Sequence, residues 1–254
     1  MARQNPAAMT RNLDQNGRID DNVDRSERAK FEVPMDQWWN PEGDFGALHR
    51  INPLRLGFID ERTSLSGKKV CDIGCGGGIL SEGMANLGAK VTGIDVSDKI
   101  LNVARAHAQQ HNVKIDYQCI AAHELAETAR AQWDIVTCLE ALEHVPDPCS
   151  LVGSCAKLVK PGGSVYFSTI NRNFRSFAHA IVGAEYVLGL LPKGTHDYSK
   201  FIRPYELLKW CEQFSMHLYD MNGISYIPIL DQYSLVKSTQ VNYIAHVIPS
   251  ESSF

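Results

Sequence analysis

Short apolar runs alternate along the chain with stretches in which apolar residues recur at helical spacing, beginning at Lys68. The apolar runs predict strands near residues 69–73, 90–94, 115–119, 133–138, 164–169, 216–225 and 240–248. The stretches between them predict helices near residues 79–87, 97–111 and 149–158. Strands that alternate with helices are typical of a mostly parallel sheet with helices on both faces. The pattern therefore predicts an α/β, Rossmann-like domain with a seven-stranded sheet.

The pattern differs before Lys68. Residues 1–22 are polar and aperiodic, so we expect a disordered N-terminal tail followed by a single domain over residues 23–254. Residues 23–47 are amphipathic and predict a helix followed by an aromatic-rich loop, and another helix is predicted from Pro53 to Arg62. Arg55 in that helix can either reach a carboxylate of a ligand or lie on a solvated basic face.

Residues 172–200 interrupt the alternation after the fifth strand. Their apolar positions recur at helical spacing, and basic residues such as Arg172 and Lys200 stand at both ends. This amphipathic insertion suits an interfacial helix on an anionic membrane. A lid helix whose apolar face covers an active site explains the pattern equally well, and one helix can serve both purposes.

Composition narrows the class of protein. The net charge of -4 gives no reason to expect a nucleic-acid partner. The seven cysteines are odd in number and include no Cys-x-x-Cys pair, which favours reduced thiols. No apolar run reaches the roughly 18 to 20 residues that a membrane-spanning helix needs. These features predict a soluble bacterial protein of the cytoplasm.

A glycine-rich turn follows the first predicted strand, in the pattern Asp72-x-Gly74-x-Gly76-x-Gly78. A dinucleotide fingerprint would need a third glycine where this chain has Ile79. The next strand ends in Asp95, where a carboxylate can accept both ribose hydroxyls of a nucleotide that lies across the turn. The motif looks like the first motif of the class I S-adenosylmethionine-dependent methyltransferases, and the alternative is a glycine-rich turn that binds no ligand.

The fourth predicted strand runs into Leu139-Glu140-Ala141-Leu142-Glu143-His144. Ligands bind outside the carboxyl ends of the strands in open α/β sheets, so this loop should line the site. A helical turn would place Glu140, Glu143 and His144 on one face, where they can hold a divalent metal. His144 can instead act as a general base, or the acids can simply stabilise the start of the next helix, which we expect Asp147 to cap. His196 is a further candidate on the cleft.

The chain resembles the ubiquinone biosynthesis O-methyltransferase family, the 3-demethylubiquinol 3-O-methyltransferases and 2-polyprenyl-6-hydroxyphenol methylases, from about Val23 to His246. The loop from Asp231 to Gln240 departs from the family pattern. The stretches that carry the resemblance are His49–Leu56, Cys71–Leu80, Glu140–Pro148, Val159–Arg172, Val182–Asp197 and Val241–Ala245.

The resemblance implies that S-adenosylmethionine contacts Arg55, Gly74, Asp95 and Leu139, and that a divalent metal such as Mg²⁺ binds Glu140, Glu143 and His144. It implies a polyprenyl catechol substrate, peripheral association with the bacterial inner membrane through residues 172–200, and other ubiquinone biosynthesis proteins as partners. Two rival functions are a methyltransferase for another small phenol and an inactive cofactor-binding scaffold subunit.

Overall fold

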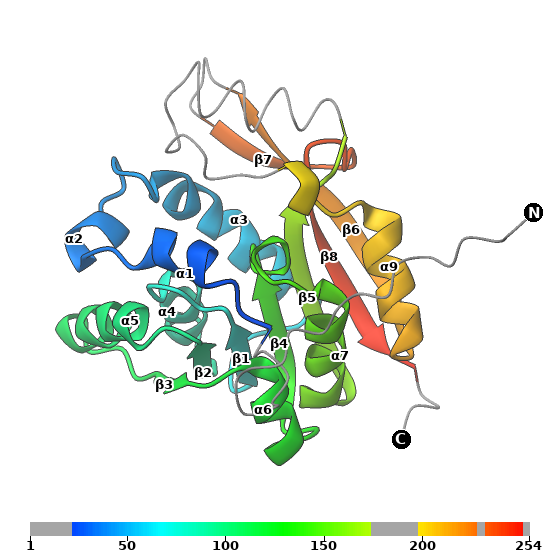
Figure 1. Cartoon of the computed structure of the whole chain (residues 1–254), viewed down its shortest axis with the longest axis horizontal. Coiled ribbons are helices and arrows are strands. Elements are labelled where there is room, and N and C mark those ends of the chain that lie inside the picture. Colours follow the sequence, from blue (N-terminus) through cyan, green and yellow to red (C-terminus); the bar gives the residue numbers. More distant parts are fainter. Residues whose placement is uncertain (1–21, 174–197, 228–231, 251–254) are drawn as a thin grey trace, which may run out of the picture.

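The computed structural model describes residues 22–173, 198–227 and 232–250 (Figure 1). The predicted tail before Asn22, His196 and most of the insertion 172–200 lie outside the described residues. Among the described residues, no helix is both long and apolar enough to cross a membrane.

The described strands form one sheet in the order β3-β2-β1-β4-β5-β8-β6-β7. The strands β1 to β5 pair in parallel, and β8, β6 and β7 continue the sheet in antiparallel pairs. The order changes direction between β1 and β4, which is where α/β sheets bind ligands. The strands are β1 (Lys69–Ile73), β2 (Lys90–Asp95), β3 (Asp116–Cys119), β4 (Trp133–Leu139), β5 (Val159–Ile170), β6 (Met216–Ile227), β7 (Gln232–Val236) and β8 (Asn242–Pro249).

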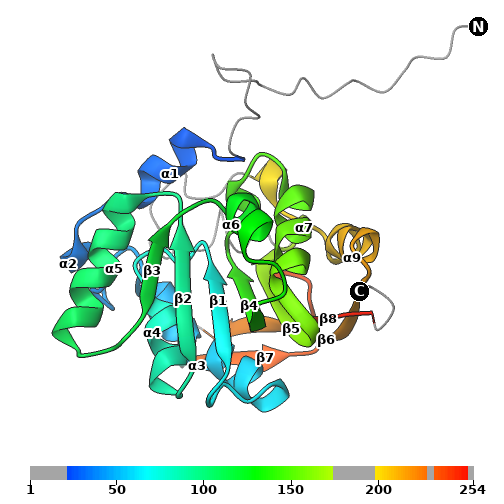
Figure 2. The ribbon, with the colours of Figure 1, turned by 90° about the horizontal axis from the view of Figure 1, so that it is seen from below.

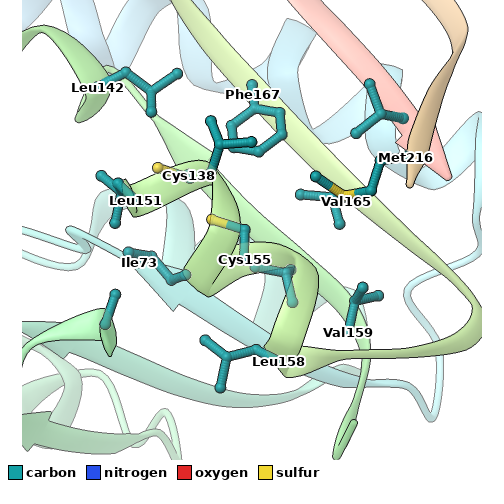
Figure 3. Close-up of a cluster of buried hydrophobic side chains, with 14 of the residues drawn as sticks. Ile73, Cys138, Leu142, Leu151, Cys155, Leu158, Val159, Val165, Phe167 and Met216 are labelled. Atoms are coloured by element: carbon teal, nitrogen blue, oxygen red, sulfur yellow. The ribbon is translucent and has the colours of Figure 1, made fainter. Parts of the chain in front are cut away.

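Helices cover both faces of the sheet (Figure 2). One face packs against α6 (Ala122–Thr128), α7 (Pro148–Leu158) and α9 (Pro204–Gln213), and their buried side chains form the largest core cluster (Figure 3). The other face packs against α3 (Gly46–Arg62) and α4 (Ile79–Asn86). The remaining α-helices of the described part are α1 (Arg25–Phe31), α2 (Met35–Trp38) and α5 (Asp98–Gln110).

The α/β prediction is confirmed, and the described part of the chain forms eight strands where the sequence predicted seven. The additional strand is β7, which pairs with β6 at the edge of the described sheet and whose residues are half-buried or exposed. An edge strand of this kind lacks the apolar run that marks the buried strands. Residues 23–47 form the short helices α1 and α2, and α3 begins at Gly46, so Pro53 lies inside that helix.

The cysteines match the expectation of reduced thiols. All seven are free, and Cys71, Cys138 and Cys155 are fully buried in the core cluster of Figure 3. Burial raises the pKa of the Cys71 and Cys155 thiols because an apolar environment disfavours the thiolate. These thiols therefore act as small apolar packing groups.

Candidate active site

The glycine-rich turn between β1 and α4 adopts backbone conformations that favour glycine. Gly74, Gly76 and Gly78 have φ angles of 67°, 53° and 92°. A Cβ atom on Gly78 would lie 2.3 Å from the hydroxyl oxygen of Tyr117. A Cβ atom on Gly77 would lie 2.6 Å from the indole of Trp38. The turn therefore needs glycine both for its φ angles and for the close approach of two aromatic side chains.

Asp72, near the end of β1, is buried beneath this turn. Its carboxylate accepts hydrogen bonds from Ser81 Oγ at 2.5 Å and Thr137 Oγ1 at 2.7 Å. Burial raises the pKa of Asp72 to about 6, although both hydroxyl hydrogen bonds oppose the rise. A cationic ligand nearby would favour its ionised form.

Asp95, at the end of β2, is hydrogen-bonded to the turn. One carboxylate oxygen accepts from the backbone N–H of Gly76 at 3.1 Å, and the other accepts from the N–H of Ser97 at 3.0 Å. The N–H groups of Gly74 and Cys75 donate to the carbonyl of Ile94 at 2.9 and 3.0 Å. These contacts fix the acid and the glycine turn relative to each other.

A cavity of about 1010 Å³ lies at this end of the sheet. It is large enough for a nucleotide-like ligand together with a second reactant. Helices α1 and α2 contribute to its wall, and α1 lies beyond the carboxyl ends of β1 to β3 (Figure 2). Except for Gly78 at the start of α4, the predicted site residues of the described part line this cavity: Arg55, Asp72, Gly74, Gly76, Asp95, Leu139, Glu140, Glu143 and His144.

Glu140 follows β4 in a left-handed backbone conformation, with a φ angle of 52°. Its Oε1 accepts from Arg55 Nη2 at 2.9 Å and from Ser168 Oγ at 2.6 Å. Arg55 is buried, so the partly exposed carboxylate of Glu140 compensates a guanidinium charge that bulk water does not reach. Arg55 thus pairs with an acid of the chain itself, within reach of the cavity.

Glu143 lies in a 3₁₀ turn, Leu142–His144, and is only 4 % exposed. Its Oε2 accepts a hydrogen bond from Thr169 Oγ1 at 2.9 Å. Burial, followed by the negative charge of Glu140, raises the pKa of Glu143 to about 8. A nearby positive charge would therefore favour the ionised form of Glu143.

His144 faces α1. Its Nδ1 lies 2.9 Å from Glu27 Oε2, and Phe31 packs edge-on against its ring with centroids 4.9 Å apart. Burial alone would lower the pKa of His144, but the hydrogen bond with Glu27 and the charge of Glu143 raise it above its ordinary value. The reciprocal hydrogen bond holds the pKa of Glu27 well below its usual range, against the effect of burial.

The structure brings Glu140, Glu143 and His144 to one cavity, but each side chain has its own partner. Across the described ranges, one group of three or more His, Cys, Asp and Glu residues has donor atoms within 4.8 Å of one another, and it is Glu82, His107 and His111. The described structure therefore does not gather Glu140, Glu143 and His144 as a ready metal site, and metal binding there stays a prediction. Asp147 caps α7 as expected, accepting from Ser150 N at 3.1 Å.

Several residues of the site were not predicted. The sequence contains an Asp24-x-x-Glu27 spacing that signals a helix start, and Asp24 does cap α1. Nothing local indicates that Glu27 reaches His144, because the two residues are separated by 117 positions. The hydroxyl donors to Asp72, Glu140 and Glu143 also carry no distinctive local signal; they are Ser81, Thr137, Ser168 and Thr169.

The fold and the glycine turn define a class I S-adenosylmethionine-dependent methyltransferase. A family model described as a methyltransferase domain matches residues 22–217. Among solved structures, a magnesium protoporphyrin IX methyltransferase from Synechocystis PCC 6803 with bound S-adenosylmethionine shares this fold, with a TM-score of 0.61 and 19 % identity over 93 % of this chain and 100 % of that one. The same enzyme with bound S-adenosylhomocysteine gives a TM-score of 0.62 and 18 % identity over 89 % and 94 % of the two chains.

The sequence comparison narrows the class to one family. The ubiquinone biosynthesis O-methyltransferase of Stutzerimonas stutzeri is 55 % identical over 227 residues, which are 89 % of this chain and 98 % of the relative. The enzyme of the same name from Azoarcus sp. is 52 % identical over 225 residues, which are 89 % and 97 % of the two chains. The chain belongs to the ubiquinone biosynthesis O-methyltransferase family.

Proposed function

We propose that the chain transfers the methyl group of S-adenosylmethionine to a catechol hydroxyl of polyprenylated ubiquinone precursors, 3-demethylubiquinol and 2-polyprenyl-6-hydroxyphenol. The observation that carries the proposal is the shared cavity, which places Asp95 and the glycine turn together with Glu140, Glu143 and His144. Apolar side chains of the same wall, Ile170 and Ile224, suit an aromatic substrate ring. The names of the relatives support a substrate from ubiquinone biosynthesis.

On the cofactor side, this chain's residues bind and orient. Asp95 would accept hydrogen bonds from the ribose hydroxyls, and the glycine turn would let the backbone approach the ligand closely. Leu139 would supply an apolar wall for the adenine. When bound, S-adenosylmethionine supplies a methyl group on a positively charged sulfur, and the departing S-adenosylhomocysteine is a neutral sulfide. The protein therefore needs no acid for the leaving group, and its main task is positioning.

On the substrate side, the protein must favour an ionised phenol. A free phenol has a pKa of about 10, so little of it is ionised at neutral pH. His144 can accept the proton as a general base, which contributes about 10²- to 10⁴-fold in typical enzymes. His196, which lies outside the described residues, is the alternative base.

The donor set also fits a divalent cation. Two carboxylates and an imidazole suit Mg²⁺ or Mn²⁺, and the raised pKa of Glu143 next to Glu140 is the environment in which a cation would displace a proton. We propose that Glu140, Glu143 and His144 hold this cation after their side chains rearrange from the contacts with Arg55, Ser168, Thr169 and Glu27. A cation there would supply positive charge that favours the ionised catechol.

We also propose peripheral attachment to the inner membrane through residues 172–200, which would bring the site to a substrate with a prenyl tail and to other ubiquinone biosynthesis proteins. At the described ends of this segment, Arg172 pairs with Glu206, and Lys200 pairs with Asp24 and Glu27. Binding of the segment to anionic lipid would therefore depend on its other basic residues. Flotation of the full chain with vesicles that contain or lack phosphatidylglycerol tests this proposal, and equal recovery with both vesicle types would count against it.

Methyl transfer to a short-prenyl catechol is the decisive test of the function. The full chain is assayed with and without a chelator, Mg²⁺ is then restored, and the same catechol without a prenyl tail serves as the matched substrate. Activity that is lost with chelator and returns with Mg²⁺ supports both the substrate class and the cation. Activity indifferent to chelator retains the methyltransferase and rejects the cation. Binding of S-adenosylhomocysteine without methylation of any catechol would reject the proposed function.

A further inference from the structure

We propose that Glu27 is a positioning residue of the active site, whose carboxylate fixes the ring of His144 and the nitrogen that carries its proton. The inference rests on the proposed function, because it concerns how His144 is prepared for its role there. Both residues line the cavity, although Glu27 belongs to α1 and His144 follows β4.

The carboxylate of Glu27 is held by contacts to both of its oxygens. Oε2 lies 2.9 Å from His144 Nδ1, whereas Oε1 accepts from Lys200 Nζ at 2.9 Å and from Lys30 Nζ at 3.0 Å. The side chain is only 8 % exposed. With separate partners on each oxygen, the carboxylate has little freedom to rotate away from His144.

This geometry assigns the proton on the imidazole. An ionised carboxylate only accepts hydrogen bonds, so Nδ1 of His144 must be the donor. The neutral ring then carries its lone pair on Nε2, which has no hydrogen-bond partner within the described part of the chain. Phe31 restrains the plane of the ring through its edge-on contact. Either role of His144, as a general base or as a metal ligand, requires this lone pair.

The segment that carries Glu27 is itself tied to the loop that carries His144. The side-chain amide of Asn22 donates to the carbonyl of Asp147 at 2.8 Å, and its oxygen accepts from the N–H of Asp147 at 2.7 Å. Lys200 donates to Asp24 at 3.1 Å as well as to Glu27, so it connects the first residue of the α1 turn with the fourth. Residues 22–31 therefore contact the histidine loop through Asn22, Glu27 and Phe31, and Glu27 is the one that hydrogen-bonds the imidazole.

The test compares Glu27→Ala and Glu27→Gln with Glu32→Gln. Glu32 is a matched control because it is a carboxylate just beyond the same helix that does not line the cavity, and its partners are Arg28, Lys99 and Ser97 rather than His144. The measurements are kcat and KM for methyl transfer, S-adenosylhomocysteine affinity by calorimetry, and ¹⁵N NMR of labelled histidine at about pH 9, where the neutral ring reports its tautomer. The wild-type His144 should appear in the form with the proton on Nδ1.

We expect Glu27→Ala to lower kcat by about 10- to 100-fold, as loss of such an orienting carboxylate typically does, while S-adenosylhomocysteine affinity stays within about twofold. His144 should shift toward a mixture of tautomers. Glu27→Gln should recover part of kcat because its amide oxygen still accepts from Nδ1, and Glu32→Gln should match the wild type.

Two results would overturn the inference. One is a wild-type spectrum with the proton of His144 on Nε2. The other is a kcat loss that occurs only together with a comparable loss of cofactor affinity and is equal in the Ala and Gln variants, since that pattern indicates a structural role. If the wild type methylates no catechol but shows the Nδ1-protonated ring, and Glu27→Ala redistributes the proton, the proposed function fails and the positioning role stands.

Discussion

The proposed cofactor region, which comprises the glycine turn with Asp72 and Asp95, and the proposed catalytic loop, residues 140–144, meet in one cavity but are assembled in different ways. In the cofactor region, Asp72 binds Ser81 nine residues away, and Asp95 binds the N–H of Gly76 19 residues away. In the catalytic loop, Glu140 pairs with Arg55 across 85 residues, and His144 pairs with Glu27 across 117 residues. The first region is built mainly by one strand–helix–strand unit, to which Thr137 of β4 adds one distant hydrogen bond to Asp72, whereas each charged pair of the second joins distant segments.

The difference explains which region a short motif can reveal. A glycine turn with an acid at the next strand end is a local pattern, and the parallel pairing of β1 with β2 places its parts automatically. The catalytic loop has a recognisable composition, but the orientation of each side chain depends on α1, α3 and β5. Substitutions in the two regions should therefore separate cofactor affinity from turnover.

The largest expected effect comes from Glu143→Gln in the catalytic loop. We expect kcat to fall by about 100-fold or more, because the neutral amide lacks the negative charge that would bind the proposed cation. The affinity for S-adenosylhomocysteine should stay within about twofold. Steady-state kinetics and calorimetry on the same preparation measure the two quantities. Glu124→Gln on α6 is the control for loss of one carboxylate that does not itself line the cavity.

An intermediate effect is expected from Asp95→Ala in the cofactor region. The variant loses the acceptor proposed for the ribose hydroxyls, and two such charge-assisted hydrogen bonds at about 1.5 kcal/mol each correspond to roughly a 100-fold loss of cofactor affinity. At saturating S-adenosylmethionine, kcat should fall much less. Asp98→Ala, at a surface ion pair with Arg105, is the nearby control. A fall in kcat as large as that of Glu143→Gln, with cofactor affinity unchanged, would erase the distinction between the regions.

The difference between local and long-range assembly also decides which strands and helices can be predicted from the sequence. Continuous apolar runs such as the one around Val70 and Cys71 mark strands that are buried on both faces, so the parallel core of the sheet is predictable. The edge strand β7 is not, because its half-exposed residues give no such run and its partner β6 is needed to define it. A seven-residue helix such as α6 is similarly too short to show a periodicity of its own.

For the site, the sequence predicts the residues that line the cavity better than their mutual contacts. The turn requires glycine at the positions with positive φ angles, and two of these, Gly74 and Gly76, line the cavity. The pairing of Arg55 with Glu140 and of His144 with Glu27 is decided by packing between distant segments. A charged residue in an amphipathic helix such as α1 is ordinarily expected on the solvated face, and only the folded chain places Glu27 inside.

The smallest expected effect concerns the charge of the buried acid in the cofactor region. Burial raises the pKa of Asp72 to about 6, from an ordinary value of 3.8. Between these values the native chain retains a proton that the unfolded chain releases, so this carboxyl makes stability fall as the pH rises through that window. Asp72→Asn does not titrate, so the stability advantage of the wild type over this variant should shrink by about 2 kcal/mol from about pH 4.5 to about pH 7.

Asp24 provides the opposite case on the segment that supports the catalytic loop. The hydrogen bonds from Ser26 and then Lys200 lower the pKa of Asp24 to about 2, so it is largely ionised in both the folded and the unfolded chain above about pH 4.5. The stability difference between the wild type and Asp24→Asn should therefore stay nearly constant over the same window. Urea unfolding of the wild type, Asp72→Asn and Asp24→Asn at several pH values measures both differences in unfolding free energy. If unfolding free energy varies with pH in parallel for the wild type and Asp72→Asn, Asp72 is ionised throughout this window. A cationic ligand would then favour ionisation of Asp72 no more than it would that of Asp24.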